Sequence, residues 1–165
     1  MKKKIRVYLD TSVISYLDQQ DAPERMQETR ELWNILATGK YEIVISSITL
    51  AEIAKCDKEK FMNLIYYISQ LDYIEYDANN DDVDELAGLI VQEDILSPKS
   101  IEDASHIAAA ILSESDIILS WNFKHLVNIK TINGVRKICF SRSFNKIIDI
   151  YSPNILLEKE DDGNE

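Results

Sequence analysis

The sequence predicts an α/β fold in which a central parallel sheet of about five strands lies between two layers of helices. Short apolar runs alternate along the chain with longer amphipathic segments, a pattern typical of a parallel sheet covered on both faces. The chain has 165 residues, 45% of them hydrophobic and 28% charged, which suits one globular domain. Only 4 Gly and 3 Pro are present, which argues against collagen-like and wholly disordered chains.

The first half of the chain contains three expected strands. A compact apolar run predicts a strand at 5–9, and apolar residues at helical spacing predict a helix at 23–37, which Gly39 ends. The β-branched run at 43–45 predicts a second strand over 42–46. Helices are expected at 49–55 and 57–69, and a third strand is expected at 73–76.

The second half continues the alternation. Amphipathic spacing predicts helices at 81–92 and 101–114, and Ile117-Ile118-Leu119 predicts a fourth strand. We expect a fifth strand at 135–140. No repeat or linker precedes Ser152-Pro153, so we expect residues 1–151 to form a single domain and residues 152–165 to form an acidic, flexible tail.

The sequence also indicates in which cellular compartment the protein is expected. The apolar runs are far shorter than the roughly 20 residues of a bilayer-spanning helix, and the start of the chain has no export signal. Cys56 and Cys139 have neither disulfide-scaffold nor Cys-x-x-Cys spacing. We therefore expect a soluble, cytoplasmic protein with no membrane partner.

The net charge of −11 argues against a polyanionic partner, but the charge is segregated. Residues 72–103 hold eleven acids and only Lys99, whereas residues 117–148 hold six bases and no acid. The basic segment is interpreted either as a set of solvated side chains or as a path for a nucleic-acid backbone.

Four polar residues are expected near the carboxyl ends of the strands, where open parallel sheets bind their ligands. They are Asp10, Glu52, Asp103 and Asn122. Each also has a structural explanation: Asp10 and Asn122 suit helix N-caps, and Glu52 and Asp103 suit capping boxes begun by Thr49 and Ser100. Three carboxylates around one cleft would repel each other unless a cation lay among them, and Mg²⁺ or Mn²⁺ suits carboxylate ligands.

Four segments carry a family resemblance: YLDTS at 8–12, SSITLAEI at 46–53, DASHIAAA at 103–110 and ILSWNFKHL at 118–126. In this order they resemble the PIN domain family, and in particular its VapC-like group, over residues 5–142. The resemblance implies a metal-dependent ribonuclease, the toxin of a toxin–antitoxin pair, with RNA as substrate and with an antitoxin and a second copy of the chain as partners. It places the divalent metal at Asp10, Glu52 and Asp103.

The resemblance also assigns the neighbours of these acids. Thr11, Ser12 and Ser120 match small hydroxyl positions that line the site. Asn122 departs from the family pattern, because many members have a fourth Asp there. The departure leaves open a catalytically weak or inactive binding module, and it weakens the case for two metal ions.

Basic residues beyond the fourth strand are candidates for substrate binding. Lys124 and His125 follow the site directly, and Arg136 lies further along the basic segment. His106, in an Ala-rich helix, is expected to be a hydrogen-bonded imidazole of the core or the site margin rather than a base. Trp121 is expected to be a core residue rather than a base-stacking one.

Overall fold

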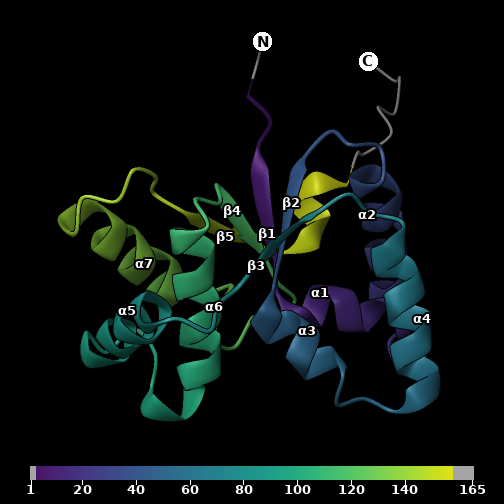
Figure 1. The fold of residues 1–165 in the computed structure, drawn as a ribbon, viewed down its shortest axis with the longest axis horizontal. Coiled ribbons are helices and arrows are strands. Elements are labelled where there is room, and N and C mark those ends of the chain that lie inside the picture. Colours follow the sequence, from purple (N-terminus) through teal and green to yellow (C-terminus); the bar gives the residue numbers. More distant parts are fainter. Residues whose placement is uncertain (1–2, 158–165) are drawn as a thin grey trace.

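The computed structural model describes residues 3–157 and has five parallel strands in one sheet (Figure 1). The strands are β1 (Arg6–Leu9), β2 (Glu42–Ser46), β3 (Ile74–Tyr76), β4 (Ile117–Leu119) and β5 (Asp149–Tyr151). Their order in the sheet is β3-β2-β1-β4-β5. The central position of β1 brings the chain that leaves its carboxyl end close to the chain that leaves β2 and β4.

Helices cover both faces of the sheet (Figure 1). Three helices, α5 (Asp81–Gln92), α6 (Ile101–Leu112) and α7 (Ile129–Ser141), lie on one side. On the other side lie α1 (Thr11–Ser15), α2 (Pro23–Leu36), α3 (Ser47–Ile53) and α4 (Lys58–Ser69). Short 3-10 helices occupy Tyr16–Asp18 (η1), Pro98–Ser100 (η2) and Pro153–Leu156 (η3). The expected three-layer α/β/α fold is confirmed.

The alternation of side chains along β1 creates two separate cores. Val7 and Leu9 point toward α2 and α4 and are fully buried there. Tyr8 points to the opposite face, among the Ala-rich helix α6 and its neighbours. Because β1 is buried on both faces, it is held firmly in place, and so is the residue that follows it.

The predicted strand at 135–140 is wrong, because these residues belong to α7. Val135, Ile138 and Cys139 are buried at helical spacing, and Asn128 caps the helix by accepting a hydrogen bond from the Thr131 backbone N at 2.9 Å. A short apolar run does not distinguish a strand from a helix segment. The fifth strand is instead β5, a three-residue strand that pairs with β4.

The chain continues to pack after the expected domain end at residue 151. Helix η3 contacts α2, and Leu156 and Leu157 pack against the core on that side. Residues 158–165 lie outside the described residues, so the flexible acidic tail stays a prediction for that part of 152–165. Across residues 3–157, no helix is long and apolar enough to span a bilayer.

Two helical glycines lead to opposite expectations for substitution by alanine. A Cβ at Gly134 in α7 would lie 2.6 Å from Cγ1 of Ile95, whereas a Cβ at Gly88 in α5 would meet nothing within 4 Å. We expect Gly134→Ala to lower the free energy of unfolding by about 1–3 kcal/mol through overpacking. We expect Gly88→Ala to raise it by about 0.4–1 kcal/mol. Urea denaturation of both variants measures this, and a Gly134→Ala protein as stable as the wild type would contradict the packing described.

Candidate active site

Asp10 lies at the centre of the carboxyl edge of the sheet, directly after β1. Its side chain is buried, and residue exposure is only 4%. One carboxylate oxygen, Oδ2, accepts hydrogen bonds from the hydroxyls of Ser12 at 2.8 Å and Ser120 at 2.7 Å. Asp10 precedes α1, but its side chain makes no cap hydrogen bond to that helix. Asp10 thus occupies the expected N-cap position of α1, but its side chain does not cap the helix.

The two serines also fix the loop that follows β4. The backbone N of Trp121 donates to Ser12 Oγ at 2.9 Å, and the backbone N of Asn122 donates to Ser120 Oγ at 2.9 Å. The hydroxyls of Ser12 and Ser120 thus link the Asp10 carboxylate to the chain leaving β4. Both serines line the site beside Asp10, where the resemblance places them.

His106 joins Asp10 to Glu52. Its Nε2 lies 3.1 Å from Glu52 Oε1 and 3.6 Å from Asp10 Oδ1, and Thr11 Oγ1 lies 3.3 Å from the same nitrogen. Its Nδ1 lies 2.7 Å from the Tyr8 hydroxyl. The imidazole is buried and hydrogen-bonded at both nitrogens, so the expectation of a satisfied histidine at the site margin is confirmed.

The carboxylates of Glu52 and Asp103 do not serve the capping boxes expected of them. The cap of α3 is Ser46, whose Oγ accepts from the Thr49 backbone N, and α6 has no side-chain cap hydrogen bond. Glu52 faces His106 instead. This capping explanation is therefore wrong for both acids. Helix α3 begins two residues earlier than expected, at Ser47, and α6 has no side-chain cap.

Electrostatic coupling within the site shifts three ionisation equilibria. Burial raises the pKa of Asp103, and the negative charge of Asp10 raises it further. Burial alone would lower the pKa of His106, but its hydrogen bond to Glu52 and the charges of the surrounding acids outweigh burial, so the pKa is raised. Burial would raise the pKa of Glu52, but His106 outweighs it and lowers that pKa. His106 and Glu52 thus favour an ion pair.

The donor set around Asp10 suits a hard divalent cation only in part. Within residues 3–157, no group of three or more His, Cys, Asp or Glu side chains has a geometry ready to hold a metal. Glu52 is turned toward His106, while Asp10 and Asp103 repel each other and a cation between them would relieve that repulsion. Magnesium is commonly held by one or two carboxylates and several waters. Of the acids at this site, Asp10 and Asp103 are the two whose mutual repulsion such an ion would relieve.

Asn122, Lys124 and His125, which follow β4, differ in their burial and in their contacts with the site. Asn122 lies beside the site, and its Oδ1 accepts a hydrogen bond from the His125 backbone N at 2.9 Å. The expected cap is therefore present, but it closes a turn over 123–126 rather than a helix. Lys124 is exposed, and His125 is partly buried near enough to Asp103 for their charges to interact.

The structure does not bring Arg136 to this site. Its guanidinium Nε donates to Asp149 Oδ1 at 2.8 Å. Asp149 is the first residue of β5 and pairs in register with Ile117, the first residue of β4. Arg136 therefore lies toward the amino edge of the sheet, opposite to Asp10. Its placement at the site was wrong because charge order along the chain does not tell in which direction a side chain of a helix points.

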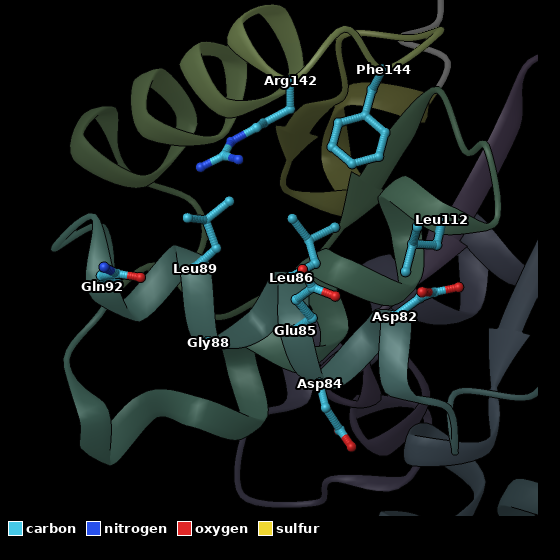
Figure 2. Close-up of a pocket in the computed structure, with 10 residues that line it drawn as sticks. All are labelled: Asp82, Asp84, Glu85, Leu86, Gly88, Leu89, Gln92, Leu112, Arg142 and Phe144. Carbon is cyan, nitrogen blue, oxygen red and sulfur yellow. The ribbon is translucent and has the colours of Figure 1, made fainter.

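A separate cavity of about 720 Å³ lies between α5 and the chain that ends α7 (Figure 2). Leu86, Leu89 and Phe144 provide apolar walls, while Arg142 and Glu85 provide charge. None of the residues gathered at Asp10 lines it. The cavity is thus distinct from the acidic site.

Comparison with known proteins places these observations in a family context. The PIN domain family model matches residues 7–124. A chain in the crystal structure of VapBC2 from Rickettsia felis, bound to a DNA fragment from their promoter, is 19% identical, with a TM-score of 0.51; the match covers 90% of this chain and 100% of that one.

A second solved structure gives the same result. A chain in the crystal structure of DNA-bound VapBC from Salmonella typhimurium is 19% identical, with a TM-score of 0.53; the match covers 90% of this chain and 98% of that one. At this identity the likeness concerns the fold. Curated protein sequences gave no significant match.

The buried ion pair predicts a pH-dependent stability. The raised pKa of His106 means that protonated His106 stabilises the fold fully below its ordinary value of 6.5, and that this stabilisation is lost as pH rises through the raised pKa. The lowered pKa of Glu52 keeps its contribution intact above 4.5. We expect His106→Gln to cost about 1–3 kcal/mol at pH 5.5 in chelator and less as the pH rises through that raised pKa. Denaturant unfolding over a pH series measures this, and a cost that is constant or grows with pH would contradict it.

Proposed function

The chain belongs to the PIN domain family, and on that premise we propose that it is a metal-dependent endoribonuclease of the VapC-like toxin type. The observation that carries the proposal is the burial of Asp10 at the carboxyl edge of the sheet, close enough to Asp103 to raise its pKa. Asp103 is partly buried, and a bound cation would relieve its repulsion with the buried Asp10. Metal-assisted hydrolysis of an RNA phosphodiester bond uses such a site.

Mg²⁺ or Mn²⁺ would be held by Asp10 and Asp103, with Glu52 directly or through water, and would supply an activated water and charge neutralisation at the phosphoryl oxygens. The chain's own residues prepare this site. Ser12 and Ser120 fix one oxygen of Asp10 and so set the orientation of its carboxylate. His106 and Tyr8 form a buried support that holds Glu52 at its margin.

Neighbouring residues contribute in other ways. Asn122 brings no charge, so we propose a single metal ion. The side-chain amide of Asn122 fixes the turn that carries Lys124 and His125. The exposed Lys124 would bind an RNA phosphate. We also propose a cytoplasmic location, an antitoxin protein that restrains the activity, and a homodimer as the assembled form.

Replacement of Asp103 tests the activity. We expect purified wild type to cleave single-stranded RNA with Mg²⁺ or Mn²⁺ and not with chelator, and we expect Asp103→Asn to slow cleavage about 10²-fold or more. Asp72→Asn, an exposed aspartate before β3, is the matched control and should cleave like the wild type. Gel analysis of labelled RNAs gives the rates.

Two outcomes would contradict the nuclease. One is cleavage that persists equally in Asp103→Asn or in chelator, which would indicate a contaminant. The other is an absence of cleavage by the folded wild type over a panel of structured and unstructured RNAs. That result would favour a binding module in which Asn122 has replaced a catalytic acid.

Lys124 and Arg136 provide a matched pair for substrate binding. Lys124 follows the site, whereas Arg136 is bound to Asp149 at the other edge of the sheet. We expect Lys124→Ala to weaken RNA binding and to reduce the slope of log affinity against log salt concentration by about 0.7, the value for one phosphate contact to a single strand. Arg136→Ala should leave that slope unchanged. Fluorescence anisotropy across a salt series measures both, and equal slopes for wild type and Lys124→Ala would remove Lys124 from the substrate path.

A further inference from the structure

A cluster of aromatic rings around Arg25 lies beside the acidic site. The guanidinium carbon of Arg25, in α2, is 4.9 Å from the ring centroid of Trp121, 5.3 Å from that of Tyr16 and 5.5 Å from that of Phe123. Among the described residues, no carboxylate forms an ion pair with Arg25. The aromatic faces therefore provide its main electrostatic partners, in cation–π geometry.

The cluster is connected to Asp10 through short covalent and hydrogen-bonded links. Trp121 follows Ser120, which donates to Asp10, and the Trp121 backbone N donates to Ser12, which donates to the same carboxylate oxygen. The Trp121 ring is itself held in place, since its Nε1 donates to Thr29 Oγ1 at 2.9 Å. Any displacement of this aromatic wall would disturb the support of Asp10.

Trp121 and Phe123 differ sharply in exposure. Trp121 is only 6% exposed, which confirms it as a core residue, whereas Phe123 is 45% exposed. The Phe123 ring lies 6.3 Å from the Trp121 ring and is inclined to it by 50°. Core packing accounts for Trp121 but leaves a large part of the Phe123 ring in solvent, three residues after Ser120.

Arg25, Trp121 and Phe123 line a cavity of about 500 Å³. Polar groups complete its lining: the carboxylates of Glu24 and Glu28 from α2 and the amide of Asn154 from η3. Two carboxylates next to the single cation of Arg25 make the cavity unsuited to a phosphate. They are suited to accept N–H groups, and the planar rings and guanidinium are suited to a flat aromatic ligand.

We propose that this cavity binds an unpaired nucleobase of the RNA substrate. The base stacks on the exposed ring of Phe123 and the guanidinium plane of Arg25, while Glu24 or Glu28 accepts hydrogen bonds from its exocyclic amino group or ring N–H. The inference rests on the proposed ribonuclease function, and it adds a subsite that orients the strand next to Asp10. Single-stranded RNA is the substrate class that supplies such a base, because the bases of a duplex are stacked and paired.

Removal of the Phe123 ring tests the subsite by binding, independently of cleavage. The probes are fluorescein-labelled decaadenylate and decauridylate, in chelator, measured by anisotropy. We expect Phe123→Ala to weaken binding of at least one probe by about 5- to 100-fold, the scale of a lost base–aromatic stack. Phe123→Trp should retain the affinity. The matched control is Phe140→Ala in α7, a phenylalanine 78% exposed, which should bind like the wild type.

The outcomes separate the subsite from the nuclease. Thermal unfolding should first show that both variants are folded. Equal affinities for Phe123→Ala, Phe140→Ala and wild type would then overturn the subsite even if the wild type cleaves RNA. Weakened binding restored in Phe123→Trp would support the subsite, and failure of the wild type to cleave would then count against the nuclease alone. With active protein and metal, the same substitution should raise KM for single-stranded RNA while kcat changes less than twofold.

Discussion

The arrangement of the site depends on one buried charge, the carboxylate of Asp10 at the end of the central strand. Burying a carboxylate is costly unless hydrogen bonds or opposite charges compensate, and the chain supplies both. Ser12 and Ser120 satisfy one oxygen, and His106 approaches the other. Because each partner comes from a different element, this single requirement links the chain after β1, the chain after β4 and helix α6.

The basic residues that cluster between positions 117 and 148 do not all serve a continuous nucleic-acid path. Two cations of the basic segment are used within the fold: Arg136 pairs with Asp149, and Lys146 pairs with Asp116 at 3.1 Å. These contacts stabilise the region where β4 and β5 begin. Lys124 remains exposed beside the acidic site. The proposed RNA substrate would therefore meet a few local groups, such as Lys124 and the Arg25 cluster, rather than the overall negative field of the protein.

The sequence was informative where topology alone fixes position. A residue directly after a parallel strand must lie at its carboxyl edge, so the placement of Asp10 and Ser120 could be predicted. Side-chain direction could not: Glu52 turns to His106, and Arg136 points to the opposite edge. A histidine in an Ala-rich helix gives no sign of its partners. The fifth strand was misplaced because a three-residue strand has too few positions to show its periodicity.

We propose that the carboxylates of Asp10, directly after β1, and Asp103, in α6, bind a divalent cation. The most direct measurement is anomalous diffraction from crystals of the protein soaked in Mn²⁺. We expect one anomalous peak contacting the carboxylates of Asp10 and Asp103, and loss of that peak in Asp103→Asn crystals. An absence of any peak at Asp10 at saturating Mn²⁺ would show that these carboxylates do not bind the ion.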